Sequence, residues 1–294
     1  MTYSIVARDP QTGQLGGAVQ SHWFAAGNGV IWAESGVGVV ATQALLDESY
    51  GPLGLDLMRG GKSADEALRA LVEVDPGRDE RQAAFVDARG RVAAHTGSRC
   101  LRAAGHTTGD GFSCQANMML SDTVWGAMRE AFVSTEGDLV HRLLAALDAA
   151  EAEGGDIRGK QAAGILVVRA ESTGQPWRDR VVDIRVDDHP EPLVELRRLV
   201  ELKLAYDRME RADELEQKGD LEGAVVEYRA ALATHGDAPE IRFWAAIAFA
   251  KTGALGEARE LLGQLSHPGW AELLRRMVSD GSLAPDLGKL LDSD

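Results

Sequence analysis

The sequence predicts an α+β protein, in which a four-layer αββα sandwich is followed by an all-α tail of helical repeats. Two observations predict the sandwich. Strand patterns come in groups separated by pairs of helices, and the strands are nearly apolar on both faces. A third observation, a repeat of 34 residues towards the C-terminal end, predicts the tail. The predicted domains are residues 1–204 and residues 205–294.

The first strand is predicted to begin at Thr2, because Tyr3, Ile5 and Ala7 alternate with polar residues. A turn at residues 9–13 leads into a returning strand over residues 15–21, so these two strands should form a hairpin. Further strands are predicted at 30–33, 37–42, 82–87, 92–96, 112–116, 164–169 and 181–186. The Gly- and Thr-rich stretch 105–111 is predicted to be a loop.

Helices are predicted in pairs between these groups of strands. The first pair covers residues 50–59 and a helix that begins after Ser63, where Glu66 completes a capping box. The second pair covers 122–134 and 139–153, and another helix opens after Pro192. Paired helices do not fit the β-α-β alternation of a doubly wound fold, so the pattern favours two packed sheets with helices outside.

The predicted tail begins where strand patterns end, near Leu193. The residues that recur at a spacing of 34 are Gly219 and Gly253, Leu221 and Leu255, and Ala224 and Ala258. This spacing is typical of a tetratricopeptide repeat, in which Gly suits the tight turn and Ala lets paired helices approach closely. Only about two units fit, so we expect them to pack on the helix after Pro192 or on a partner.

The formal net charge of −15 repels phosphate backbones and anionic lipid, which argues against a nucleic-acid or membrane partner. No basic-then-apolar export signal is present, so a cytoplasmic protein is expected. Cys100 and Cys114 form neither a disulfide framework nor a metal-ligand spacing. Residues 187–189 offer metal ligands without a second cluster, so no metal and no cofactor are predicted.

Thr2 is the first candidate for catalysis. Removal of Met1 would leave a threonine that carries its own free amine, which is the layout of an N-terminal nucleophile. Gln115 and Asn117 stand at alternate positions of one strand, where their amides could stabilise an oxyanion or fill a pocket. We therefore predict Thr2 and Asn117 as catalytic residues.

Polar residues at predicted strand ends and in one glycine-rich loop are candidates for substrate binding. His22 could be a base, a substrate donor or an ordinary loop residue, and Thr42 could be a strand-end cap. The loop 154–161 could bind a carboxylate-bearing substrate, or its charges could pair with one another. The predicted binding residues are Ser21, His22, Thr42, Gln43, Gln115, Asp156, Arg158, Lys160 and Gln161.

Several segments, in order along the chain, resemble one bacterial family. They are residues 2–9, 36–43 with 50–54, 105–109, 115–118, 154–161 and 186–190. The chain resembles domain-of-unknown-function family 1028, which is similar in fold to N-terminal nucleophile (Ntn) hydrolases. The resemblance covers about Thr2 to Leu202 and implies αββα layers, with Thr2 attacking an amide by analogy. The C-terminal part resembles a helical extension of some members, for which peptidoglycan binding has been suggested.

Two functions are expected from these observations. The first is hydrolysis of an amide bond in a small polar substrate by an N-terminal nucleophile. The alternative is a non-catalytic binding or scaffold protein whose helical repeats hold a protein, peptide or glycan partner. A homo-oligomer is compatible with either.

Overall fold

The computed structural model describes residues 2–284, and the chain forms two compact units that divide between Arg198 and Leu199. The division falls within helix α6 (Pro192–Gln217), and the predicted boundary after residue 204 lies in the same helix. The first unit contains two antiparallel sheets with helices, and the described part of the second is helical. The predicted α+β class with a helical tail is therefore confirmed.

The first unit contains one six-stranded sheet and one four-stranded sheet. The larger has the order β10-β9-β2-β1-β8-β7, and the smaller has the order β3-β4-β5-β6. The strands are β1 (Thr2–Arg8), β2 (Leu15–Ser21), β3 (Ile31–Glu34), β4 (Gly38–Ala44), β5 (Arg81–Asp87), β6 (Val92–Thr96), β7 (Gly105–Gly109), β8 (Phe112–Asn117), β9 (Ala162–Val168) and β10 (Arg180–Val186). Strand β1 thus lies inside the larger sheet, between β2 and β8.

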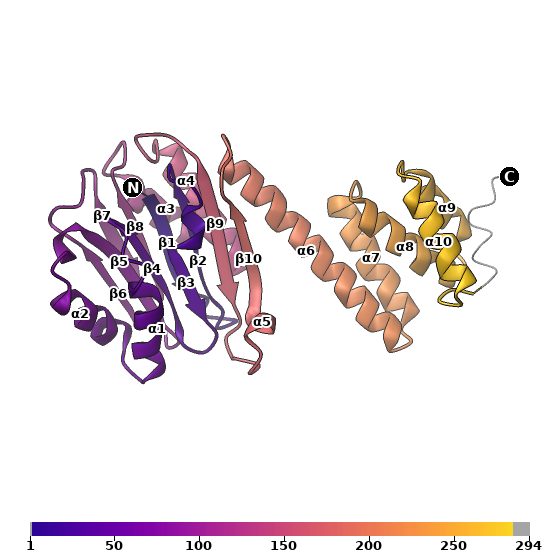
Figure 1. Ribbon diagram of the computed structural model, residues 1–294, viewed down its shortest axis with the longest axis horizontal. Helices are drawn as coiled ribbons and strands as arrows, with labels where there is room; N and C mark the ends of the chain where they lie inside the picture. Colours follow the sequence, from indigo (N-terminus) through magenta and orange to yellow (C-terminus); the bar gives the residue numbers. More distant parts are fainter. Residues whose placement is uncertain (1, 285–294) are drawn as a thin grey trace. The chain divides into compact units, whose positions relative to one another are not determined.

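Helix pairs cover the outer faces of the two sheets (Figure 1). Helices α1 (Tyr50–Arg59) and α2 (Ala64–Val74) pack on the smaller sheet, and α3 (Val124–Ser134) and α4 (Leu139–Ala152) on the larger. The predicted capping box is present, because Ser63 Oγ accepts from the backbone N–H of Glu66, whose carboxylate accepts from the backbone of Ser63. The short elements are α5 (Pro176–Asp179) and the 3₁₀ turns η1 (Ala26–Asn28) and η2 (Arg78–Glu80).

Successive side chains of β1 point to opposite faces of the larger sheet, one covered by α4 and the other packed against the smaller sheet. Tyr3 lies on the face covered by α4, where its hydroxyl donates to Glu151 at 2.8 Å. Val6 lies on the other face, in an apolar cluster shared by both sheets that includes Val19 and Val39. Ser4 is also buried, but it meets polar side chains, so the interior between the sheets changes from apolar to polar towards the start of β1.

One predicted loop is wrong. Residues Gly105–Gly109 form the edge strand β7, which pairs with β8. Its Gly and Thr composition is typical of turns, but Gly105 serves close packing: a Cβ atom there would lie 2.6 Å from Trp125 Cζ2. The local composition indicates a turn, but the segment is a strand whose glycine allows close packing against α3, which comes later in the chain.

The second unit repeats one helix-turn-helix pattern. Beyond α6 it contains α7 (Leu221–His235), α8 (Pro239–Lys251), α9 (Leu255–Gly263) and α10 (Gly269–Ser279). The first residues of α7 and α9 are 34 positions apart, and the turns before them contain Gly219 and Gly253 with φ of 83° and 86°. Ala224 and Ala258 are fully buried, as close helix packing requires. Within residues 2–284, no helix is both long and apolar enough to cross a membrane.

Candidate active site

Thr2 lies at the first position of a central strand and is almost fully buried, with 4% of its surface exposed. In the register of the sheet it faces Ser21 on β2 and Asn117 on β8. Its hydroxyl donates to Ser21 Oγ at 3.1 Å, and its carbonyl accepts from Gln43 Nε2 at 3.3 Å and Asn117 Nδ2 at 3.4 Å. The structure therefore brings four of the predicted site residues together around the start of β1.

A chain of buried hydrogen bonds lies next to Thr2, between the two sheets. Its five steps measure between 2.6 and 2.8 Å, and each side chain is at most 1% exposed. In order, the side chains are Ser113, Gln115, Ser4, Gln43, Gln82 and Asn117. None of the six carries a charge, so the network gives Thr2 a neutral, well-ordered polar surrounding.

Gln82 joins this network across the two sheets and was not predicted as a site residue. Its Oε1 accepts from Gln43 and Asn117, while its Nε2 lies within hydrogen-bond distance of Thr96 Oγ1 and the Ala116 carbonyl, both at 2.9 Å. The signal in the sequence was a lone amide before the apolar residues 83–86 of a predicted strand. Its partners lie on other strands, so the sequence alone does not reveal them.

A cavity of about 510 Å³ opens beside Thr2. Thr2, Ser21 and Gln43 supply polar groups to its lining. Apolar side chains form most of the rest, namely Trp23, Phe24, Ala25, Ala26, Val30, Ala44, Leu45 and Leu46. Its size is within the range of roughly 300–1,000 Å³ that is usual for small-molecule sites.

A second cavity, of about 330 Å³, shares Ala44 and Leu45 with the first and is lined by Asn117. Its other lining residues are Glu80, Arg99, Cys100 and Leu101. Burial raises the pKa of the Cys100 thiol, which therefore stays protonated and is a poor nucleophile at neutral pH. Among the lining residues, only Asn117 was predicted for the site.

Backbone strain concentrates around these two cavities. In the described chain, the non-glycine residues with positive φ are Ala25 at 54°, Ala44 at 72° and Met118 at 55°. Ala25 and Ala44 line the cavities, and Met118 follows Asn117 directly. Left-handed backbone at such residues costs about 1–2 kcal/mol each and is characteristic of functional sites.

We expect Ala44→Gly to raise the free energy of unfolding by about 1 kcal/mol, because glycine adopts this conformation without a Cβ clash. Ala94→Gly, inside strand β6, is the matched control and should lower stability by roughly 0.5–1 kcal/mol. Urea denaturation of the two variants measures both values. A loss of stability in Ala44→Gly would show that Ala44 is not strained.

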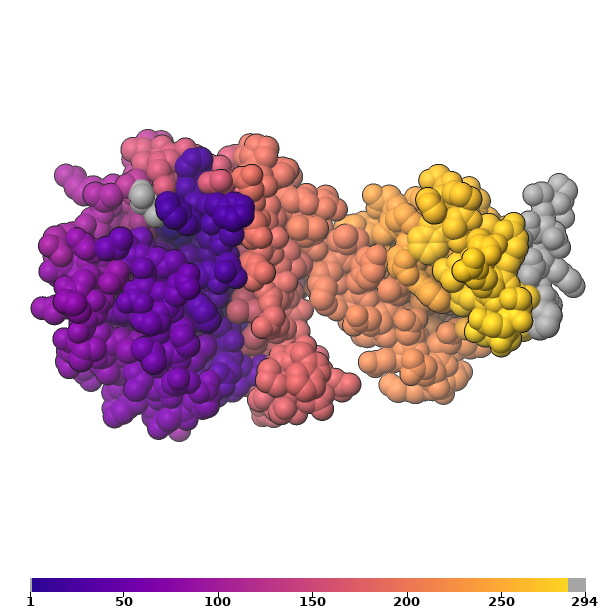
Figure 2. Space-filling view, viewed as in Figure 1, coloured from indigo at the N-terminus to yellow at the C-terminus, as the bar shows by residue number. Residues whose placement is uncertain are grey.

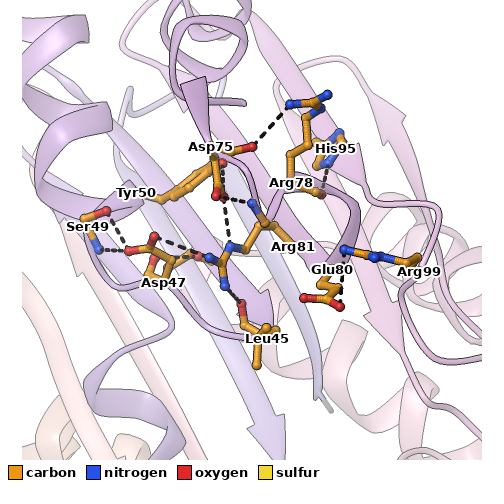
Figure 3. Close-up of polar contacts among 12 residues, drawn as sticks. Leu45, Asp47, Ser49, Tyr50, Asp75, Arg78, Glu80, Arg81, His95 and Arg99 are labelled. Atoms are coloured by element: carbon orange, nitrogen blue, oxygen red, sulfur yellow. Dashed lines mark hydrogen bonds and ion pairs between the residues drawn. The ribbon is translucent and has the colours of Figure 1, made fainter. Parts of the chain in front are cut away.

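The segment after β4, which forms the wall shared by the two cavities, is held by Arg81 (Figure 3). Arg81 Nη1 donates to the Leu45 carbonyl at 2.7 Å, and its Nε donates to Asp75 Oδ2 at 2.9 Å. The Tyr50 hydroxyl donates to the same carboxylate oxygen at 3.1 Å. The hydrogen bond from Arg81 is the largest cause that lowers the pKa of Asp75.

This arrangement predicts a specific loss of stability in acid. Because the pKa of Asp75 is lower in the folded protein than in the unfolded chain, its stabilising contribution is present above the unfolded value of about 3.9. That contribution is lost as the pH falls through the lower folded value. We expect Asp75→Asn to be less stable than wild type at neutral pH, with a difference that narrows below about pH 4. Thermal unfolding of both proteins across this range measures the difference, and a constant gap would contradict the assignment.

The glycine-rich loop predicted for substrate binding pairs with itself and with its neighbours. Arg158 Nη2 donates to Asp156 Oδ2 at 2.8 Å, and the backbone N–H of His22 donates to the same oxygen at 3.1 Å. Lys160 forms an ion pair with Glu191 at 2.5 Å. None of these five residues lines either cavity. A role in substrate binding for His22, Asp156, Arg158 and Lys160 stays a prediction.

Two other predicted residues have structural partners. Thr42 Oγ1 donates to the Asp47 carbonyl at 3.0 Å, where it caps the end of its strand. Gln161 Nε2 donates to Asp188 Oδ1 at 3.1 Å. Across residues 2–284, no group of three or more His, Cys, Asp or Glu side chains is placed to hold a metal ion.

Comparison with known proteins agrees with the two-part organisation. Residues 2–196 match a family of unknown function, DUF1028, and residues 215–269 match a tetratricopeptide repeat. A DUF1028 protein from Silicibacter pomeroyi, known from its crystal structure, is 35% identical, with a TM-score of 0.62 over 68% of this chain and 84% of that one.

Anbu, described as an ancestral beta-subunit, from Yersinia bercovieri is 12% identical, with a TM-score of 0.35 over 70% of this chain and 96% of that one. No curated protein matches this sequence. The family match covers residues 2–196 of the 294 in the chain, which therefore belongs to the family of unknown function DUF1028.

Proposed function

We propose that this protein hydrolyses an amide bond with Thr2 as an N-terminal nucleophile. The observation that carries the proposal is the position of Thr2, at the first residue of a central strand and in the lining of a cavity large enough for a small molecule. The helix–sheet–sheet–helix layering of the first unit is in keeping with an Ntn-hydrolase-like αββα sandwich. The proposal places the protein in the cytoplasm, where an aminopeptidase removes Met1.

In the proposed reaction, the Thr2 amine takes the proton of its own hydroxyl as Oγ1 attacks the amide carbonyl. The C–N bond then breaks, the proton passes to the leaving amine, and the acyl group remains as an ester on Thr2. Water, activated by the same amine, hydrolyses this ester. No lysine is among the residues that line the two cavities, and the scheme uses the Thr2 amine as the base.

Asn117 has a defined place in this scheme. Its Nδ2 donates to the Thr2 carbonyl and to Gln82 Oε1, at 3.4 and 2.8 Å, which engages both amide hydrogens. We propose that Asn117 holds the nucleophile in position in the free enzyme. Donation to the oxyanion stays a prediction, and it would require Asn117 to release one of these partners.

Two measurements on wild-type protein test the proposal. The intact mass of protein purified from a bacterial host should show that Met1 is absent, and an N-terminus other than Thr2 would exclude the mechanism. A β-lactone probe should then acylate Thr2. Its ring C–O bond opens as the Oγ1 ester forms, so the protein gains the full mass of the probe. Tandem mass spectrometry should locate this mass in the N-terminal peptide.

The tetratricopeptide match supports a second candidate, a binding or scaffold protein whose repeats hold a protein, peptide or glycan partner. A chain that ends at Gln217, the last residue of α6, separates the two candidates. Unchanged acylation of Thr2 in this chain would support catalysis that does not need the repeats. Loss of a bound partner, together with no acylation in either chain, would favour the scaffold.

A further inference from the structure

We propose that the cavity beside Thr2 binds an apolar acyl group, so that the substrate is the amide of an apolar carboxylic acid. This inference rests on the proposed function. We call the cavity of about 510 Å³, with its lining residues Trp23, Phe24, Val30, Leu45 and Leu46 around Thr2, the acyl chamber.

Exposed apolar side chains gather at this chamber. Four of the fourteen large hydrophobic residues exposed in the described chain line it: Trp23 at 63%, Phe24 at 64%, Leu45 at 57% and Leu46 at 39%. Trp23 and Phe24 follow β2 with only His22 between, and the early part of the chain, in indigo, reaches the surface of the first unit (Figure 2). A cluster of exposed apolar groups around a concave site with a few polar groups is characteristic of ligand binding.

The order of the strands places the two cavities on opposite sides of Thr2, because β1 lies between β2 and β8. Ser21 and Asn117 flank Thr2 on opposite sides, and they line different cavities. The Thr2 hydroxyl donates to Ser21, so it is directed towards the acyl chamber. In the proposed complex, the carbonyl that it attacks lies on that side, with its acyl group in the chamber and the leaving amine towards Asn117.

The two cavities also differ in the charged residues that line them. Among the residues that line the acyl chamber, Glu48 is the one with a charged side chain. The second cavity has both Arg99 and Glu80, whose side chains lie 3.4 Å apart. The second cavity thus offers charged groups of both signs beside its apolar residues, and in the proposed complex it holds the polar part of the substrate while the chamber holds the apolar part.

Binding to the Thr2→Ala variant tests the chamber without turnover. Calorimetric titration with linear alkanamides from butanamide to decanamide should show affinity that rises roughly fourfold for each methylene until the chamber is filled. Leu46→Asp in the same background should weaken octanamide binding at least tenfold.

Val133→Asp is the matched control, because Val133 is an exposed apolar residue of α3 that does not line the chamber. It should leave octanamide binding unchanged. Trp23→Ala, at a position that is 63% exposed and safe for folding, should weaken octanamide binding severalfold and serves as a second chamber variant. Affinity that does not depend on chain length, or that is equal in the Leu46→Asp and Val133→Asp proteins, would overturn the proposal.

The outcomes separate this inference from the proposed function. Chain-length-dependent binding without acylation of wild-type Thr2 by the β-lactone would support the chamber as a binding site and exclude the nucleophile. Acylated Thr2 with a flat alkanamide series would support the nucleophile and overturn the acyl chamber.

Discussion

Thr2→Ala is expected to abolish acylation by the β-lactone, with a rate at least about a thousandfold below that of wild type. The alanine amine remains, but the attacking hydroxyl is gone. Thr2→Ser keeps both groups and should retain a rate within roughly tenfold of wild type. Ser21→Ala removes the hydrogen-bond partner of the nucleophile and should lower the rate by about tenfold.

Two further proteins distinguish nucleophilic attack from non-specific acylation. Thr12→Ala removes an exposed hydroxyl from the turn before β2 and should change nothing. A protein with leucine inserted between Met1 and Thr2 keeps the hydroxyl but displaces the free amine, and it should not be acylated. Equal rates in Thr2→Ala and wild type would eliminate the proposed nucleophile. Acylation of the leucine-inserted protein would show that the hydroxyl acts without the amine.

The start of the site was predictable because its determinants are local. Alternation along residues 2–7 fixes which side chains of β1 share a face, and the turn at residues 9–13 fixes the return of β2. Together they place Ser21 opposite Thr2, as observed in the register of the sheet. The spacing of 34 residues predicted the tail in the same way, since each turn and each buried alanine recurs.

The rest of the site depends on contacts between distant segments. The charges of the loop 154–161 were compatible with a ligand site or with internal pairing, and Arg158 in fact pairs with Asp156. Besides Ser21 on β2, the polar groups beside Thr2 come from β4, β5 and β8. In the sequence, nothing distinguishes Gln82 from other strand residues, because its partners lie on other strands of the two packed sheets. Which amide meets which partner is a property of that packing and is not visible in one strand.

Gln82 and Gln20 offer a matched test of what the buried network contributes. Both are strand glutamines with no exposed surface. The Gln82 amide joins both sheets, whereas neither amide atom of Gln20 has a hydrogen-bond partner within the described chain. The same substitution should therefore destabilise the protein at Gln82 but not at Gln20.

We expect Gln82→Met to lower the free energy of unfolding by about 3–5 kcal/mol. Methionine matches the length of glutamine, so little packing is lost, but Gln43 Nε2, Asn117 Nδ2 and the Ala116 carbonyl each lose a buried partner. The acylation rate of Thr2 should fall as well, because Gln43 and Asn117 hold its carbonyl.

Gln20→Met should instead be neutral or raise the free energy of unfolding by about 1 kcal/mol, because it removes a buried amide whose desolvation is not compensated by a hydrogen bond. Urea denaturation of both variants gives the comparison, and the acylation rate in Gln20→Met should equal that of wild type. Similar losses at the two positions would mean that side-chain volume, and not the hydrogen-bond network, stabilises this interior. A stabilised Gln20→Met beside a destabilised Gln82→Met with slow acylation would show that the amides between the sheets keep Thr2 in place.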